Sequence, residues 1–104
     1  MTIVAHVPNL FDRSRFGGRV VFVDSPQEAL AHEPDLMIVD LDRSEDALAF
    51  VVPHAHIIGF GPHVDSDGHA AALAGGYDEV FARSVFFRRL DELLDSAAAP
   101  ESES

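Results

Sequence analysis

Cysteine, tryptophan and lysine are all absent from this sequence of 104 residues. Without cysteine, the chain has no disulfide, no thiolate ligand for a metal and no thiol nucleophile. Without lysine, no reaction step that needs a lysine ammonium or amine group is available, and all seven basic residues are arginines. Long hydrophobic runs are also missing, and the N-terminus lacks a basic segment followed by an apolar one. We therefore expect a cytoplasmic protein with no membrane partner.

Positive charge is scarce as well. There are 18 acidic residues against 7 basic ones, which gives a formal net charge of −11. A surface this acidic repels phosphate backbones, so we do not expect nucleic acid as a direct partner. The apolar content of 47% excludes a disordered chain, and 104 residues suffice for one domain with a single hydrophobic core.

The clearest structural signal is the segment 34–42, in which a short apolar run ends in two acids, Asp40 and Asp42. An apolar run of this length is typical of a central strand that a parallel sheet buries on both faces. Open α/β sheets carry their sites at the C-terminal ends of the strands. Since side chains two residues apart point to the same side of a strand, Asp40 and Asp42 form a candidate site at that end.

Strand and helix signals alternate along the rest of the chain. Besides the central run, strands are predicted over residues 3–7, 19–23, 56–60 and 79–83. Helical segments are predicted over residues 10–16, from Pro26 to before Pro34, over 44–50, over 67–74 and from Ser84 onward. The expected N-caps are Asn9 for the first helix, Ser25 for the second, Asp42 or Ser44 for the third and Ser84 for the last.

Five strands that alternate with helices predict right-handed crossovers and one parallel sheet between two helical layers. The expected fold class is therefore three-layer α/β/α with the flavodoxin-like strand order 2-1-3-4-5 and a shortened first helix. In this order the ends of the first, third, fourth and fifth strands meet around Asp40. Residues 1–95 form the predicted domain, and residues 96–104 are predicted to be a disordered acidic tail.

Two segments give the sequence a resemblance to response-regulator receiver domains. Residues 34–40, Pro-Asp-Leu-Met-Ile-Val-Asp, resemble the third strand of that family, and residues 74–80, Ala-Gly-Gly-Tyr-Asp-Glu-Val, resemble the segment before its fifth strand. The resemblance covers roughly residues 2–95 and implies that Asp40 is at the phospho-acceptor position. Residues 9–16, 59–65 and 82–84 are also similar to a group of short stand-alone receiver-like bacterial proteins.

The rest of the receiver reaction centre is missing from the matching positions. The family uses two acids after strand one to hold Mg²⁺ with the acceptor carboxylate, a hydroxyl after strand four and a lysine after strand five. Here Pro8 and Asn9 stand in place of the acids, Gly61 in place of the hydroxyl residue and Ala82 in place of the lysine. The resemblance therefore implies a degenerate, phosphorylation-independent receiver with no catalytic residue and no cofactor. Its vestigial pocket would comprise Asn9, Arg13, Asp40, Asp42, Gly61, His63 and Arg83.

Two interpretations stay open for the acids and arginines of this pocket. Asp40 and Asp42 could hold a cation with Asn9, or Asp40 could be a leftover acid that is hydrogen-bonded or paired with an arginine. Arg13 and Arg83 could reach toward Asp40 from the loops after strands one and five and replace the lost cation. The alternative is that both arginines lie on the surface.

The histidines also allow a metal-binding interpretation. His63, Asp65, Asp67 and His69 alternate in the manner of metal ligands, but capping of the next helix by the acids is the favoured interpretation. His54 and His56 are expected at the opposite end of the sheet from His63, which makes a shared zinc site unlikely on geometric grounds. No metal site is therefore predicted.

Three functions compete. The leading one is a non-enzymatic signalling or binding module that recognises a protein partner, or a second copy of itself in a homodimer, through its last helix and last strands. The second is a sensor of a small ligand or anion in the crevice at the C-terminal ends of the strands, with Arg13 and Arg83 as binding residues. The third is an enzyme that retains phosphoryl chemistry at Asp40, as a phosphoryl-accepting response regulator does, or hydrolytic chemistry with the histidines. It ranks last because no nucleophile and base stand at a recognisable spacing.

Overall fold

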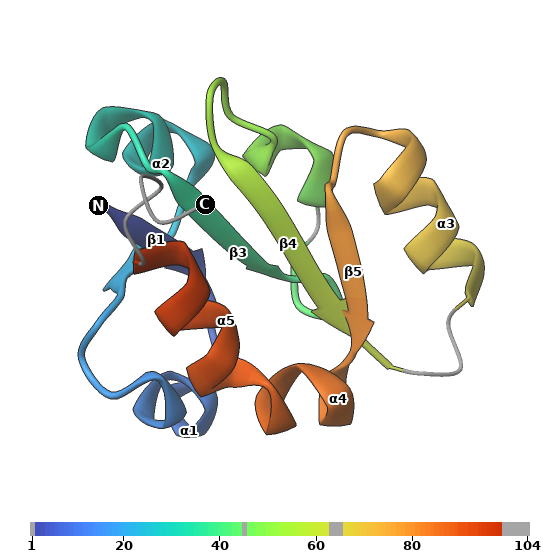
Figure 1. The fold of residues 1–104 in the computed structure, drawn as a ribbon. Coiled ribbons are helices and arrows are strands. Elements are labelled where there is room, and N and C mark those ends of the chain that lie inside the picture. Colours follow the sequence, from blue (N-terminus) through green and yellow to red (C-terminus); the bar gives the residue numbers. More distant parts are fainter. Residues whose placement is uncertain (1, 45, 63–65, 99–104) are drawn as a thin grey trace.

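A parallel sheet forms the centre of the computed structural model, which describes residues 2–44, 46–62 and 66–98 (Figure 1). Its strand order is β2-β1-β3-β4-β5 and every neighbouring pair is parallel, so the predicted order and fold class are confirmed. The strands are β1 (Ile3–His6), β2 (Val21–Phe22), β3 (Leu36–Asp40), β4 (His56–Gly61) and β5 (Glu79–Ala82).

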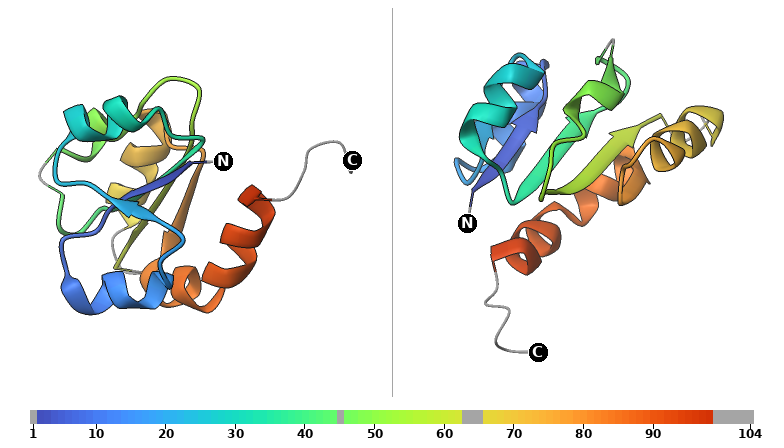
Figure 2. Two further views of the ribbon diagram at one scale, coloured as in Figure 1. Left: turned by 90° about the vertical axis from the view of Figure 1, so that its left-hand side faces the viewer. Right: turned by 90° about the horizontal axis from the view of Figure 1, so that it is seen from above.

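Helices cover both faces of this sheet (Figure 2). One face carries α1 (Leu10–Arg13), the 3₁₀ helix η1 (Ser14–Phe16), α4 (Arg83–Arg88) and α5 (Leu90–Ala98). The other face carries α2 (Pro26–His32), the 3₁₀ helix η2 (Ala47–Phe50) and α3 (Ser66–Ala74). No helix in the described residues is both long and apolar enough to cross a membrane.

The central strand β3 is buried along its whole length, as the apolar run predicts. Leu36 and Ile38 belong to the core on the side of α1, α4 and α5, whereas Met37 and Val39 belong to the core on the opposite side. This division follows from the alternation of side chains along a strand, since both faces of β3 are covered by helices. Asp40 is the last residue of the strand and is as fully buried as its apolar neighbours.

Local capping chemistry explains the start of the first two helices. The Asn9 side-chain oxygen accepts hydrogen bonds from the backbone N–H groups of Phe11 and Asp12, at 2.9 and 3.2 Å. Ser25 Oγ accepts from the Glu28 N–H at 3.2 Å, and α2 begins with Pro26 as expected. The predicted caps of both helices are therefore confirmed.

Two predicted helices differ from the structure. The described residues of the segment 44–50 form the 3₁₀ helix η2 and no α-helix. The Ser44 hydroxyl donates to the Asp40 carbonyl at 2.6 Å instead of capping a helix. The last helix begins at Arg83 with Ala82 as its N-cap residue, so the prediction of Ser84 as the cap is wrong. Helical structure then continues, with a break at Arg89, to Ala98 and thus past residue 95. Residues 99–104 of the expected tail lie outside the described residues.

The segment 74–80 has a structural role that explains part of the receiver resemblance. Gly76 follows α3 with a φ of 118°, a conformation that glycine adopts without steric cost. The next residue, Tyr77, is buried and donates its hydroxyl to the Ala47 carbonyl at 2.7 Å, and this burial raises its pKa. Its ring also covers Gly59, where a Cβ atom would lie 2.9 Å from the tyrosine Cε2. This segment therefore fixes η2 and β4 relative to each other.

Candidate functional site

Asp40 lies at the C-terminal end of the sheet, the end at which an open α/β sheet places its site. Its Oδ1 accepts a hydrogen bond from the Asp42 N–H at 3.1 Å. Its Oδ2 is buried and has no hydrogen-bond partner among the described residues. A buried acceptor without a partner is costly, so the neighbourhood must reduce the charge of this carboxyl group or compensate it.

The pKa of Asp40 is raised, and burial is the largest cause. The Asp42 N–H and the positive charge of Arg83 act in the opposite direction, and the charges of Asp12 and Asp42 raise the pKa further. Asp40 is therefore an acid that shares its surroundings with one cation and with two other carboxylates.

The cation is held in place by a second buried acid. The Arg83 guanidinium donates to Asp12 Oδ1 and forms an ion pair with it. The side chain of Asp12 is only 5% exposed, and its Oδ2 also lacks a hydrogen-bond partner in the described part of the chain. Asp12, Asp40 and Arg83 thus form one charged cluster in which the Arg83 guanidinium supplies the positive charge.

Asp12 did not figure among the candidate site residues, although the sequence contains a signal for it. Phe16 is the buried residue of the first helical segment, and residues four apart share one face of a helix. Asp12 lies four positions before Phe16 and faces the interior with it, whereas Leu10 and Phe11 point outward. The helical phase set by Phe16 therefore indicates the buried acid.

Arg13 lies apart from this cluster. Its Nε donates to the Val7 carbonyl at 2.7 Å, and its Nη2 lies 3.3 Å from Asp24 Oδ1. The guanidinium also lies over the ring of Phe22, 5.1 Å from the centroid. Of the two arginines considered for the vestigial pocket, only Arg83 is an electrostatic neighbour of Asp40.

The other residues of the vestigial pocket have separate roles. The Asn9 oxygen is used as a helix cap, and the Asp42 side chain is exposed to solvent. Gly61 ends β4 and is buried, yet an added Cβ would be in ordinary contact, 3.5 Å from Leu41 Cβ and from His69 Nε2. Packing therefore does not require glycine at the position where the receiver family has a hydroxyl. His63 lies outside the described residues.

The histidines do not form a metal centre in the part of the chain that the structure describes, where no group of three or more metal-ligating side chains is suitably placed. His56 lies at the N-terminal end of β4, and its Nε2 is 2.6 Å from Glu79 Oε2. His69 Nε2 is buried without a hydrogen-bond partner among the described residues. Asp65, like His63, lies outside those residues.

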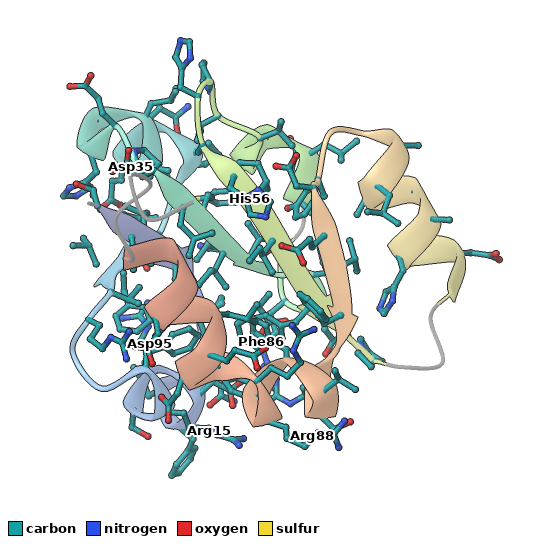
Figure 3. All side chains as sticks on the ribbon, in the orientation of Figure 1. Arg15, Asp35, His56, Phe86, Arg88 and Asp95 are labelled. Carbon is teal, nitrogen blue, oxygen red and sulfur yellow. The ribbon has the colours of Figure 1, made fainter. Side chains whose placement is uncertain are left out.

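Aromatic rings form the floor of the charged cluster. Phe60 is the β4 residue paired in register with Asp40, and its ring stacks on Phe86, which Figure 3 labels, at a centroid distance of 4.5 Å. Phe87 contacts Phe60 edge-on at 5.2 Å. The Arg83 guanidinium lies over both Phe60 and Phe87, 5.9 and 5.1 Å from their centroids. The two rings therefore provide an aromatic surface on which the Arg83 guanidinium rests while it pairs with Asp12.

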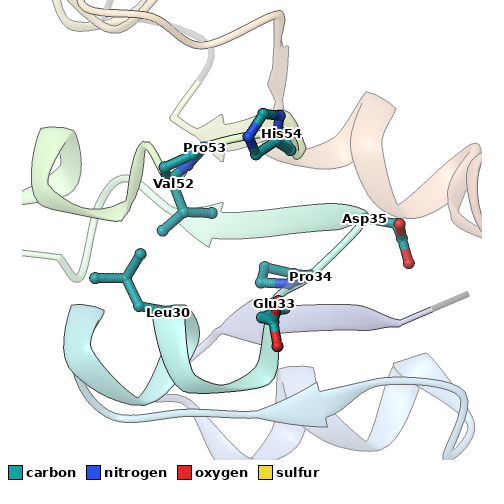
Figure 4. A pocket seen from close by; sticks show the side chains of 7 residues that line it. All are labelled: Leu30, Glu33, Pro34, Asp35, Val52, Pro53 and His54. Atoms are coloured by element: carbon teal, nitrogen blue, oxygen red, sulfur yellow. The ribbon is translucent and has the colours of Figure 1, made fainter.

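A separate pocket lies at the opposite end of the sheet (Figure 4). It has a volume of about 300 Å³ and contains none of the predicted site residues. Asp35, one of its lining residues, accepts a hydrogen bond from the Thr2 N–H at 2.8 Å. The pocket is lined by Leu30, Glu33, Pro34, Asp35, Val52, Pro53 and His54.

Neither a protein-family model nor a curated protein matches this chain. Among solved structures, the chain is similar to a protein from Sinorhizobium meliloti described as a CpaE2 pilus assembly protein, with a TM-score of 0.57 and 17% sequence identity. The similarity covers 88% of this chain and 98% of that one. At this identity the similarity concerns the fold alone, and it agrees with the five-stranded flavodoxin-like sheet.

Proposed function

We propose that the chain is a receiver-like protein-interaction module whose activity does not depend on phosphorylation of Asp40. The observation that carries this proposal is the complete burial of Asp40 beside the ion pair of Arg83 and Asp12. Phosphoryl transfer requires an acceptor oxygen that can approach the donor in line with the leaving group. A carboxyl group with no exposed surface does not meet this requirement.

Electrostatics support the same conclusion. A metal ion between Asp12 and Asp40 would have to bind beside the positive charge of Arg83, which already compensates these carboxylates. Without a bound metal, a lysine and a hydroxyl residue, little is left to stabilise the charge of a transferring phosphoryl group. Loss of even one such group typically costs about 3 kcal/mol of transition-state stabilisation.

Exposed apolar side chains support a role in protein interaction. Leu10 and Phe11 are consecutive in α1 and are 73% and 85% exposed. Adjacent exposed apolar residues favour contact with another protein, whereas single ones are common on any surface. The outer residues of α5, such as Asp91 and Glu92, are acidic. We therefore propose a contact surface at the start of α1, instead of the last helix and last strands that the sequence suggested. Its proposed occupant is a protein partner with an apolar patch, with self-association as the first case to test.

Intact-mass measurement tests phosphorylation independence. We expect no mass change after incubation with acetyl phosphate and Mg²⁺, because no oxygen of Asp40 is accessible. A gain of one phosphoryl group that is lost in Asp40→Asn would refute this part of the proposal.

Sedimentation velocity at increasing concentration tests self-association. We expect Phe11→Ser to weaken association about thirtyfold, since burial of a phenylalanine contributes on the order of 2 kcal/mol. Leu73→Ser is the matched control, because Leu73 is 49% exposed in α3 on the other face of the sheet. If the wild type stays monomeric, pull-downs from native extract with the same variants test binding to a different protein. The proposed contact surface is refuted if Phe11→Ser still captures every protein that the wild type captures.

A further inference from the structure

Three of the seven arginines line one surface depression of about 350 Å³. It lies between η1 and α4, and its lining residues are Arg15, Arg83, Ser84, Phe87 and Arg88. Arg15 and Arg88 are labelled at the lower edge of Figure 3, near the helices that follow β1 and β5. In a chain with a net charge of −11, such a concentration of positive charge is unexpected for a surface that has no ligand.

Two of these arginines have no ion-pair partner among the described residues. Arg13, Arg19 and Arg89 each form an ion pair with a nearby acid. Arg83 pairs with Asp12, whereas Arg15 and Arg88 form no ion pair within the part of the chain that the structure describes. The depression therefore has an excess of positive charge that an anion would neutralise.

An aromatic ring fixes two of the guanidinium groups. Arg15 and Arg83 both lie over Phe87, with guanidinium carbons 4.1 and 5.1 Å from the ring centroid. Phe87 itself is 9% exposed and packs against Phe16 and Phe60, so the ring has a fixed position. Stacking on an aromatic face leaves the N–H groups at the guanidinium edge free to donate to a ligand.

We propose that Arg15, Arg83, Ser84 and Arg88 bind a phosphate group non-covalently. Guanidinium groups donate pairs of hydrogen bonds to phosphate oxygens, and a serine hydroxyl can donate one more. Phosphate fits better than a carboxylate because its two negative charges and tetrahedral oxygens can serve several guanidinium groups at once. The site is distinct from Asp40, which does not line the depression, and it does not require the proposed interaction role.

NMR titration of the full chain at constant ionic strength tests this site. Inorganic phosphate and phenyl phosphate are the probes, with acetate as a singly charged comparison. We expect saturable shifts at the backbone amides of residues 14–16 and 83–88, and weaker binding of acetate. Tighter binding of phenyl phosphate identifies a phosphate ester as the ligand class, and equal or weaker binding identifies free phosphate; both outcomes support the site.

Charge-removing variants separate a specific site from general attraction. Arg15→Gln and Arg88→Gln should each weaken phosphate binding about fivefold or more, as expected for a lost hydrogen bond to a charged group. Arg43→Gln removes the same charge from a different pocket and should change the affinity less than about twofold. Unchanged amide spectra outside the substituted site show that each variant is folded. Absence of saturable shifts in the wild type, or equal weakening by Arg43→Gln, would overturn the proposal.

Discussion

The two ends of the sheet use their acidic residues differently. At the N-terminal end, Asp35 accepts from the Thr2 N–H and Asp78 accepts from the Ile57 N–H, both at 2.8 Å, and both acids are exposed. At the C-terminal end, Asp12 and Asp40 are buried and each has one carboxylate oxygen without a partner among the described residues. Buried polar groups of native proteins are nearly always hydrogen-bonded. Buried polar groups that lack hydrogen bonds are most often found at functional sites, so their position marks the C-terminal end as the candidate site. The acids at the N-terminal end instead bond backbone N–H groups of neighbouring segments.

Removal of the cation should have the largest effect on the C-terminal end. Arg83→Gln leaves Asp12 and Asp40 buried without a positive neighbour, and we expect a loss of about 2 kcal/mol in the free energy of unfolding. This is less than for a fully buried pair, because the Arg83 side chain is 42% exposed. Urea unfolding measures the change. Arg43→Gln is the control, with an expected change within about 0.5 kcal/mol; equal losses in both variants would show that Arg83 does not compensate the buried acids.

At the N-terminal end of the sheet, removal of an acid should lower the stability by the contribution of one hydrogen bond. Asp78→Ala removes the acceptor for the Ile57 N–H, and we expect a loss of about 1 kcal/mol in the free energy of unfolding. Asp42→Ala is the control from the other end, because the exposed Asp42 side chain makes no hydrogen bond among the described residues. Urea unfolding of both variants checks the prediction. A larger loss of unfolding free energy in Asp42→Ala than in Asp78→Ala would contradict it.

Substitution of Asp40 should have the smallest effect, and it should raise the stability of the protein instead of lowering it. Because the pKa of Asp40 is raised in the folded state, its ionisation opposes folding once the pH rises above the ordinary aspartate value of 3.8. Asp40→Asn keeps an acceptor for the Asp42 N–H and removes this cost. We expect the variant to be slightly more stable than the wild type at neutral pH, with the difference shrinking toward pH 3.8. Thermal melting of both proteins over this pH range checks the prediction. A difference in melting temperature that grows as the pH falls would contradict it.

Short-range patterns predicted most of the fold. The apolar run before Asp40, the Asn9 cap and the Ser25 cap depend on neighbours within a few residues, and each is found as expected. The strand order follows from the alternation of strands and helices, which restricts how a parallel sheet can be connected. Two local features were nevertheless missed: the Ser44 hydroxyl donates to the Asp40 carbonyl instead of capping a helix, and α4 begins directly after β5.

The site was harder to predict because its contacts join distant segments. Asp12 and Arg83 are 71 positions apart, and nothing near Arg83 in the sequence indicates that it pairs with a buried acid. Arg13 and Arg83 both follow strand ends, yet only the folded chain shows that Arg13 bonds the Val7 carbonyl. The sequence therefore identified Asp40, the edge of the sheet and Arg83 as one of two candidate cations, but neither Asp12 nor which of the two arginines lies near Asp40.

The most direct measurement is a carboxyl ¹³C NMR titration of Asp40 against pH, with and without Mg²⁺. Arg83 already supplies the positive charge beside Asp40, so we predict the same titration curve in both conditions, with a midpoint above the ordinary value of 3.8. A midpoint that Mg²⁺ lowers would show that Asp40 and its neighbours still bind the cation, and it would contradict the proposal that this carboxyl group has lost its phosphoryl chemistry.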